Sequence, residues 1–466
     1  MSQSEAIQDE GLPLWLPRLA PHGGPRFLQV ADALQAAVAE GRLKPGDRLP
    51  PQRLLAARLG VDLTTITRAY DEARRRQLLE GRGARGTYVA APKVEWSTVL
   101  DLSMNTPPPP EGVDFDDLLR QGLSQVLMRA DSDRLMTYHL AGGSEADRQA
   151  GARWLAPMLG AVEARQVLVC PGAQAALAAL ILAQTGPGDV ILAEPLLYPG
   201  LRAAAGQFGR RLVAVEADGQ GMLPDRLEEA CRQHQPRLVY LNPTLQNPTA
   251  ITLPERRRRA LVGVAKRCHV RIVEDDPYWL LAESPPPPMA ALAPEQVSYI
   301  STLSKCLTPG LRVAFVRIPD PQERERFLAA LRSFALMVAP LSAALATQWI
   351  VDGSAQALMQ GVGHEARQRH RMAQDLLAGR YGGAGEGLHA WLELPGYWNG
   401  PQFARAADGE GIAVTPAEAF AIDGVPVNAI RISLGGLKER ARLQAGLQGL
   451  SRLLARRPDS VGAAVV

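Results

Sequence analysis

From about residue 160 onward, short apolar runs alternate with helical patterns, and this alternation restricts the fold more than any other feature of the sequence. Helical stretches rich in Ala or Arg, at 173–184 and 254–267, separate apolar runs of strand length at 166–170, 190–193, 211–215, 238–241 and 271–274. Strands that alternate with helices indicate an α/β domain with a mostly parallel sheet. Two later strand patterns, 389–394 and 428–433, precede a closing helical pattern and predict a smaller C-terminal α+β lobe.

The N-terminal part of the chain has a different pattern, of short helices joined by tight turns. Apolar residues recur at helical spacing in 28–40, and Gly41 ends this first helix. We expect a second helix over 51–59, then a Gly-containing turn and a third helix over 63–77. Two helices separated by such a turn have the geometry of a helix-turn-helix. The Gly-rich basic stretch 80–89 predicts a small β-hairpin, or wing.

The 466-residue chain has a formal net charge of +3, and the basic excess is concentrated in this N-terminal segment. Residues 24–90 contain 12 Lys and Arg against 7 Asp and Glu, whereas residues 91–466 contain 38 of each sign. A basic excess in a segment of small-domain size is typical of a surface that meets a polyanion such as DNA. A solvated helical face with a few additional arginines would explain the same excess without any partner.

The composition and the cysteine pattern exclude several classes of protein. Hydrophobic residues make up 46% of the chain and charged residues 21%, which is usual for a globular protein. The four cysteines are widely separated and form no CxxC pair, so we expect neither a disulfide framework nor a metal site. The N-terminus has no signal-peptide pattern, and no uncharged apolar stretch reaches about 18 residues. We therefore expect a soluble cytoplasmic protein with no membrane span.

One long run, GRLKPGDRLPPQRLLAARLGVDLTTITRAYDEARRRQLLEGRGARGTYV, resembles the winged helix-turn-helix of GntR-type bacterial transcriptional regulators. The resemblance covers nearly all of residues 24–90 and rests on the ordered sub-motifs GRLxPGDRLP, LAARLGV, TxxRAY and GRGxxGTYV. We therefore expect a DNA-binding domain at 24–90, a linker at 91–98 and a second domain at 99–460. One departure is Asp62-Leu63, which stands where the family often has Ser/Thr-Arg at the start of the recognition helix.

This resemblance implies which residues contact DNA. The N-terminal residues of a recognition helix reach base edges or flanking phosphates. Arg53, on the preceding helix, and the arginines of the wing are expected to contact phosphates or the minor groove. The expected DNA-binding residues on the recognition helix are Thr64, Thr65, Thr67 and Arg68, and those in the wing are Arg82 and Arg85.

The second domain carries an ordered series of short motifs close to the ends of the predicted strands, where ligands of an open α/β sheet bind. In chain order they are Pro171-Gly172-Ala173-Gln174, Glu194 to Tyr198, Asn247-Pro248-Thr249, Asp275 to Tyr278, and Ser304-Lys305 with Arg312. The series resembles that of the fold-type I aminotransferases, which use pyridoxal 5′-phosphate (PLP), over roughly residues 100–455. Ala250 replaces the family's Gly after Asn-Pro-Thr, which leaves the shape of that loop open.

The resemblance assigns a role to each residue around the cofactor ring. Lys305 forms the Schiff base (internal aldimine), because only a primary amine can make an imine and release it again. Asp275 pairs with the pyridinium nitrogen and keeps it protonated. Tyr278 and Asn247 hydrogen-bond the ring 3′-oxygen, and Tyr198 stacks on the ring face.

The phosphate and a substrate carboxylate have their own expected partners. The phosphate takes backbone N–H groups at the start of a helix, two hydroxyls and an arginine fork. These partners are Ala173, Gln174, Thr302, Ser304 and Arg312. By analogy, Tyr138 reaches a phosphate across a dimer interface, and Arg431, in NAIRISLGG, grips a carboxylate bidentately.

A GntR-type head on an aminotransferase-like body resembles the MocR-type regulators. The resemblance implies a homodimeric, PLP-binding transcription factor that senses an amine or amino acid and binds repeated operator half-sites. Two alternatives stay open: an active aminotransferase, with a 2-oxo acid as acceptor, that carries a DNA-binding head, and an aminotransferase whose head no longer binds DNA. The sequence does not reveal the effector, the operator, the direction of regulation or whether transamination turns over.

Overall fold

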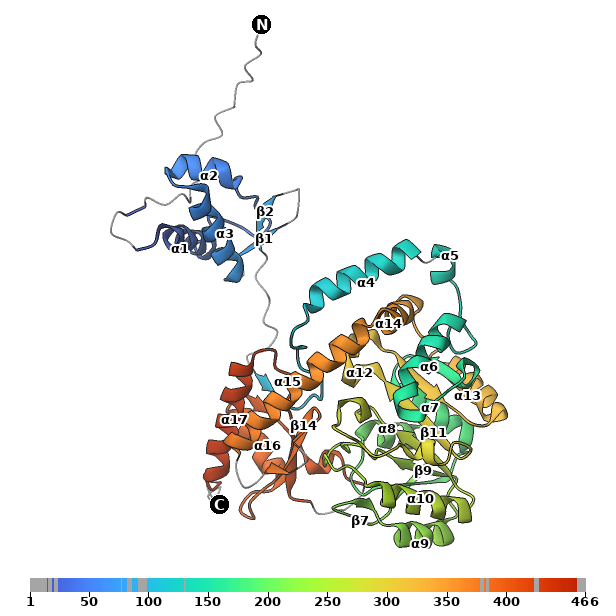
Figure 1. Ribbon diagram of the computed structural model, residues 1–466. Coiled ribbons are helices and arrows are strands. Elements are labelled where there is room, and N and C mark those ends of the chain that lie inside the picture. The colour runs from blue at the N-terminus through green and yellow to red at the C-terminus, as the bar shows by residue number, and fades with distance from the viewer. Residues whose placement is uncertain are drawn as a thin grey trace. The chain divides into compact units, whose positions relative to one another are not determined.

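The computed structural model divides the chain into two compact units, residues 1–98 and 99–466 (Figure 1). The structure describes these residues: 15, 19–20, 24–76, 78–81, 86–90, 99–129, 131–377, 381–382, 385–422 and 427–458.

The first unit is a small three-helix domain with a two-stranded antiparallel sheet. Its elements are α1 (Arg26–Ala39), α2 (Gln52–Leu59), α3 (Leu63–Arg75), β1 (Leu79–Gly81) and β2 (Thr87–Val89). Gly60 ends α2 with a φ of 61°, a left-handed conformation that glycine adopts without strain, and so turns the chain into α3. Tyr70 of α3 is buried, and its hydroxyl donates to the backbone oxygen of Pro50 at 2.9 Å. These contacts confirm the predicted helix-turn-helix with its β-hairpin.

A seven-stranded sheet forms the centre of the second unit, in the order β4-β12-β11-β10-β9-β5-β6. The strands are β4 (Val167–Cys170), β5 (Val190–Ala193), β6 (Arg211–Ala214), β9 (Leu238–Leu241), β10 (Arg271–Asp275), β11 (Val297–Thr302) and β12 (Ala314–Arg317). β12 runs antiparallel to both of its neighbours, β11 and β4, and the other neighbouring strands pair in parallel. The sheet is therefore mixed but mostly parallel, which confirms the predicted α/β class.

Helices cover both faces of this sheet, because successive residues of each strand enter opposite cores. In β9, for example, Val239 and Leu241 pack into one core, whereas Leu238 and Tyr240 pack into the other. The first core contains residues of α6 (Glu145–Leu159), α9 (Pro224–His234), α10 (Glu255–Arg267) and α14 (Pro340–Asp352). The second contains residues of α7 (Ala173–Gln184), α8 (Pro199–Gln207) and α13 (Pro321–Phe334). Such strands are apolar on both faces, which is why they read as continuous apolar runs.

The smaller lobe is an antiparallel sheet covered by helices. Its strands, in the order β13-β14-β17-β16, are β13 (Tyr381–Gly382), β14 (His389–Glu393), β17 (Ala429–Ser433) and β16 (Thr415–Pro416). The helices α15 (Ser354–Leu376), α16 (Gly400–Gly409) and α17 (Arg440–Ala455) supply side chains to its core. At the start of the second unit, β3 (Leu100–Asp101) pairs in parallel with β15 (Ile412–Ala413). The first strand of the second unit therefore belongs to the smaller lobe.

Further elements link the parts of the second unit already described. They are α4 (Phe115–Arg129), α5 (Ser132–Leu135), α11 (Met289–Leu292), α12 (Leu303–Cys306), β7 (Ala217–Asp218) and β8 (Gly221–Met222). In the part of the chain that the structure describes, no helix combines the length and the apolar character needed to cross a bilayer.

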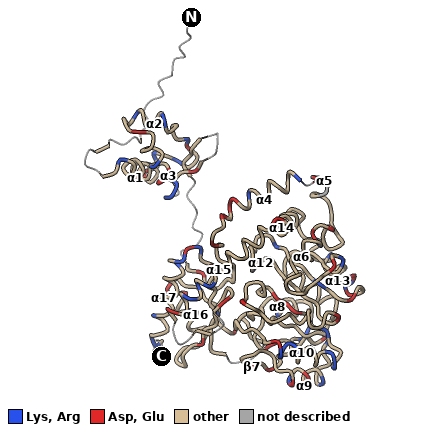
Figure 2. The backbone as a smooth tube through the Cα atoms, viewed as in Figure 1, with Lys and Arg blue, Asp and Glu red and all other residues tan. Residues whose placement is uncertain are grey.

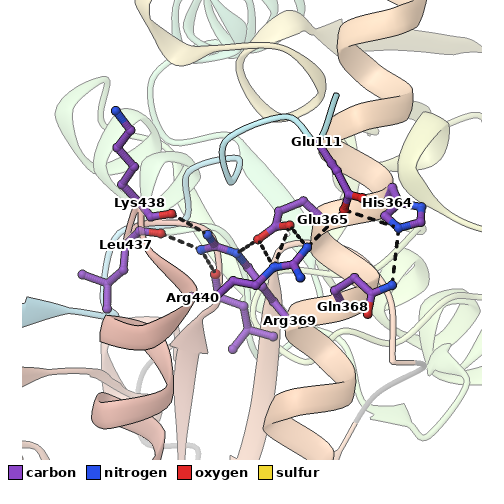
Figure 3. Close-up of polar contacts among 9 residues, drawn as sticks. Glu111, His364, Glu365, Gln368, Arg369, Leu437, Lys438 and Arg440 are labelled. Carbon is purple, nitrogen blue, oxygen red and sulfur yellow. Dashed lines mark hydrogen bonds and ion pairs between the residues drawn. The ribbon is translucent and has the colours of Figure 1, made fainter. Parts of the chain in front are cut away.

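An ion-pair network holds the extended arm that follows β3 against α15 and α17 (Figure 3). The arm includes the predicted extended run Pro107 to Pro110, and the next residue, Glu111, accepts a hydrogen bond from Arg440 at 3.1 Å. Arg440 also bonds Glu365, which is buried and accepts from Arg369 at 2.7 Å. Burial alone would raise the pKa of Glu365, but the hydrogen bonds from Arg440 and Arg369 hold it below its usual value.

Arg369 is fully buried, and we expect its replacement to destabilise the smaller lobe strongly. Arg369→Met removes the charge next to Glu365 and takes a donor from the backbone oxygens of Leu434, Leu437 and Lys438. Loss of one partner of a buried ion pair costs about 3–5 kcal/mol. Urea unfolding followed by circular dichroism measures the effect. The control Arg371→Met changes an exposed arginine on the same helix and should cost less than about 0.5 kcal/mol; equal costs for the two variants would contradict the role of Arg369.

Candidate functional site

A cavity of about 570 Å³ lies where the strands of the large sheet end and the smaller lobe begins. It brings together every predicted cofactor and carboxylate residue except Tyr138. The predicted residues in its wall are Ala173, Gln174, Tyr198, Asn247, Asp275, Tyr278, Thr302, Ser304, Lys305, Arg312 and Arg431. Since these residues come from several strand ends and from β17 of the smaller lobe, the fold rather than local sequence assembles the site.

Asp275, the last residue of β10, is a buried carboxylate with an unused oxygen. Its Oδ2 accepts a hydrogen bond from the Tyr240 hydroxyl at 2.8 Å, and its backbone oxygen accepts one from Asn242. Its Oδ1 has no partner among the described residues. Burial raises the pKa of Asp275 to about 6, against the opposing effects of the Tyr240 hydrogen bond and of Lys305. A protonated pyridine nitrogen would supply both the missing donor and the missing positive charge.

Lys305 lies in α12, at the turn that follows β11. Burial lowers the pKa of its ammonium to about 8, with the nearby cations Arg431 and Arg312 acting in the same direction and Asp275 opposing them. Its Nζ donates a hydrogen bond to the backbone oxygen of Asn105. A lysine with a lowered pKa has a larger share of neutral amine, which is the form that attacks an aldehyde.

The other end of the cavity is built for an anion. Gly172, with a φ of 86°, is the N-cap residue of α7. Because glycine has no side chain to accept hydrogen bonds from the first N–H groups of this helix, those groups can bind a ligand. A side chain is disfavoured at Gly172 because of this positive φ, and a Cβ there would also displace the end of the Arg312 side chain, whose Nη2 would lie 2.7 Å away. Arg312 is exposed at this end of the cavity. The hydroxyls of Thr302 and Ser304 lie 3.1 Å apart in the same cavity wall.

The predicted carboxylate arginine, Arg431, is buried in β17 and projects to the cavity. Its Nη1 donates to Oδ1 of Asn247 at 2.8 Å, its Nη2 donates to the backbone oxygen of Ser103, and its Nε has no partner among the described residues. The guanidinium lies over the ring of Phe420, 4.8 Å from its centroid. Burial lowers the pKa of Arg431, although it remains a cation. An incoming carboxylate therefore finds a desolvated fork whose present partners are neutral oxygens.

The site also contains residues that are not predicted from the sequence, among them Tyr240, Asn242, Asn105 and His389. Tyr240 and Asn242 stand at the carboxyl end of β9, a position that could have singled them out. Asn105 lies in an irregular segment without a motif, and His389 is a buried residue of the smaller lobe. Nothing local in the sequence marks these last two.

Tyr138 does not join the cavity of its own chain. Its side chain is 70% exposed, in the segment between α5 and α6. Its expected contact with a phosphate of a second subunit remains a prediction.

The cavity fits PLP in its chemistry. Asp275 has an orphan oxygen for the pyridine nitrogen, Lys305 offers an amine of lowered pKa, and Arg312 stands beside the N–H groups that begin α7. PLP bound there supplies an electron-accepting ring. In this cavity Asp275 would hold the ring nitrogen, Arg312 and the first N–H groups of α7 would hold the phosphate, and Arg431 would hold a substrate carboxylate.

The recognition helix of the first unit, α3, presents a polar face. Thr64 and Arg68 of this helix are exposed, as is Arg53 of α2, and Thr65 is half-buried. Arg68 lies over the ring of Phe27, 4.1 Å from its centroid, which restricts its position on the surface. Figure 2 shows acidic and basic residues intermixed over the second unit.

Thr67 differs from its neighbours because its hydroxyl is already used inside the domain. It donates to Oε1 of Gln52 at 2.9 Å and lies 3.0 Å from the backbone oxygen of Leu63. Thr67 thus fixes α3 against α2, and its expected contact with DNA stays a prediction. Arg82 and Arg85, predicted in the wing, lie outside the described residues.

Comparison with known proteins first defines the class. Residues 97–445 match the family model of aminotransferases of class I and II, and residues 27–89 match that of bacterial regulatory proteins of the gntR family. The crystal structure of LysN, the α-aminoadipate aminotransferase of Thermus thermophilus complexed with N-(5′-phosphopyridoxyl)-L-leucine, aligns with a TM-score of 0.70. It is 26% identical, and the alignment covers 77% of this chain and 92% of LysN. The chain is a GntR-type helix-turn-helix joined to a PLP-binding, fold-type I aminotransferase domain.

Relatives that contain both parts identify the family. The HTH-type transcriptional regulator YdeF of Bacillus subtilis is 30% identical over 451 residues, covering 94% of this chain and 96% of YdeF. The vitamin B6 salvage pathway transcriptional repressor PtsJ of Salmonella typhimurium is 29% identical, covering 88% of this chain and 94% of PtsJ. The chain belongs to the MocR-type transcriptional regulators of the GntR family.

Proposed function

We propose that this protein is a PLP-dependent sensor of an amine or amino acid that regulates transcription through its head at residues 24–90. The contacts of one segment carry the proposal. Ser103 and Asn105 follow β3, shortly after the predicted linker at 91–98, and their backbone oxygens accept hydrogen bonds from Arg431 and Lys305. The two cations expected to bind the cofactor and the effector therefore hold the first segment of the second unit.

Occupation of the site changes both contacts. Lys305 leaves the Asn105 oxygen when its amine binds the cofactor, and a carboxylate on Arg431 competes with the Ser103 oxygen. A ligand moves an equilibrium only if it binds the two states differently. Two contacts that depend on the ligand suffice in principle for a coupling of about 1–3 kcal/mol between effector and DNA. The segment that follows the linker is thus where such a coupling would begin.

An exposed apolar surface supports the proposed homodimer. Large apolar side chains that a monomer would leave in water lie on and around α4 and α14: Leu127, Met128, Met136, Leu341 and Val351. Exposed clusters of this kind usually mark an interface. Tyr138 follows Met136 in the same exposed segment, so a dimer formed there would bring this residue towards the second subunit. The two heads of such a dimer would bind the two half-sites of an operator. Because a regulator must reach the chromosome, we also propose that the protein is cytoplasmic.

The second candidate is an active aminotransferase that carries a DNA-binding head. The favouring observation is that the cavity contains a complete set of residues for the chemistry, including Lys305 and Asp275. Purified protein supplied with PLP, a panel of amino acids and a 2-oxo acid separates the candidates. A sensor changes its cofactor absorbance and its DNA affinity without sustained formation of a new amino acid, whereas an enzyme turns over.

We expect Arg431→Ala to abolish the effect of the effector on DNA affinity, because the variant has no fork for the carboxylate. Fluorescence anisotropy with the DNA upstream of the protein's own locus measures this, with PLP and each amino acid of the panel. Arg431→Lys keeps the charge without the bidentate geometry and should respond weakly. The control Arg405→Ala, at an exposed position of α16, should respond like the parent. If Arg431→Ala also responds like the parent, the effector is not held at Arg431.

A further inference from the structure

Asn105 connects two buried rings in the wall of the cofactor cavity. The residue is 4% exposed, and its Nδ2 lies 2.8 Å from the hydroxyl oxygen of Tyr278 and 3.0 Å from Nδ1 of His389. The two rings are tilted by 56°, with centroids 5.5 Å apart. An amide nitrogen has two hydrogens, so it can serve both neighbours at once.

The proton positions in this chain follow from its far end. Nε2 of His389 lies 3.1 Å from the backbone oxygen of Gln246, which can only accept, so Nε2 carries a hydrogen. Burial lowers the pKa of His389 to about 3, with Arg431 and Lys305 acting in the same direction, so the ring is neutral. Its Nδ1 is then an acceptor and needs a donor. The Asn105 amide must therefore turn its NH₂ group towards His389, because the opposite orientation would place two acceptors 3.0 Å apart.

The same orientation decides what Tyr278 can do. The second hydrogen of the Asn105 amide goes to the Tyr278 oxygen, which acts as the acceptor. The hydrogen of the Tyr278 hydroxyl is then left to be donated elsewhere, and Tyr278 lines the cavity. Other charged and titratable groups also act on this hydroxyl, namely Arg431, Asp275 and Tyr198. Asn105 differs from these groups because it is hydrogen-bonded to the hydroxyl.

We propose that Asn105 and His389 are positioning residues, which orient the Tyr278 hydroxyl so that it donates its hydrogen to the ring oxygen of PLP. The inference rests on the proposed cofactor site. Hydrogen bonds in a chain polarise one another, so donation from Asn105 also makes Tyr278 a stronger donor. A stronger donor stabilises negative charge on the ring oxygen, and the cofactor linked to Lys305 then loses its proton at lower pH.

The test is a pH titration of the absorbance of the protein-bound cofactor. Asn105→Ala is expected to raise the midpoint by roughly 0.5–1 pH unit, as for the loss of one neutral hydrogen bond, and to weaken PLP binding in equilibrium dialysis. His389→Leu removes the acceptor and should shift the midpoint in the same direction. His389→Asn places Oδ1 near the position of Nδ1 and should restore the parent midpoint.

A double-mutant cycle asks whether Asn105 acts through Tyr278. Asn105→Ala should shift the midpoint in the parent but not in the Tyr278→Phe background, where there is no hydroxyl to orient. If Asn105→Ala does not fold, the two His389 variants carry the test with residue 105 unchanged. Equal midpoints for the parent and His389→Leu, or an undiminished Asn105 effect in Tyr278→Phe, would overturn the proposal. A parent protein without bound-cofactor absorbance would instead contradict the proposed cofactor site itself.

Discussion

Lys305→Ala is expected to abolish the covalent attachment of PLP. The side chain stands in a cavity that also contains the orphan oxygen of Asp275 and the exposed fork of Arg312. Bound-cofactor absorbance at roughly 410–430 nm should disappear, as expected for the loss of a PLP Schiff base. Borohydride reduction followed by peptide mass spectrometry should find the label at residue 305 in the parent and nowhere in the variant.

The lowered pKa of Lys305 gives this reaction a pH dependence. With a pKa of about 8, about a quarter of the lysine is neutral at about pH 7.5, against roughly 0.1% at the usual value of about 10.4. Because the neutral amine is the nucleophile, the rate of attachment should rise with pH and level off above about 8. Stopped-flow absorbance with free PLP measures it. The control Lys438→Ala removes an exposed lysine and should change neither the rate of PLP attachment nor the pH at which this rate is half-maximal. If borohydride labels Lys438 or another lysine in Lys305→Ala, the assignment of Lys305 is wrong.

Most strands of the large sheet can be predicted from short apolar runs in the sequence. The apolar runs predict β5 and β9 with their observed bounds but miss β11. β11 is buried throughout but contains Ser298 and Ser301, whose hydroxyls accept hydrogen bonds from Gln184 and Trp154. Since those partners are far away in the sequence, the local pattern of β11 does not look like a core strand. The antiparallel strand β12 is missed too, although turn residues flank it on both sides, at Pro309-Gly310 and Pro319-Asp320-Pro321.

In the candidate site too, the residues that can be predicted are those with a local sequence pattern. Residues with a recognisable spacing, such as Asp275 with Tyr278, can be named from the sequence. Asn105 and His389 cannot, because their roles depend on contacts across 173 and 143 residues, to Tyr278 and Gln246. Ala250 is an intermediate case: it replaces a glycine of the family, yet its φ of 58° is the conformation that glycine favours. The backbone shape of this loop is therefore imposed by its surroundings rather than by the residue.

The second large effect concerns the head. We expect the double variant Arg53→Ala, Arg68→Ala to bind DNA roughly a hundredfold more weakly than the parent, at about 1.5 kcal/mol for each charged hydrogen bond lost. Both side chains are exposed, on α2 and in the first half of α3. Arginines that contact phosphates contribute to binding whatever the base sequence. The loss should therefore be similar for the DNA upstream of the protein's own locus and for unrelated DNA of the same length.

The salt dependence of binding distinguishes a phosphate contact from damage to the domain. Each lost phosphate contact lowers the slope of log affinity against log salt by about one, whereas partial unfolding lowers the amount of active protein and leaves the slope unchanged. The matched control is Arg74→Ala, in the last turn of the same helix α3, where the arginine pairs with Asp71. It should keep both affinity and slope. If the double variant keeps the parent's slope while its affinity falls, Arg53 and Arg68 support the fold of the head, and the DNA contact must be sought elsewhere on α3 or in the wing.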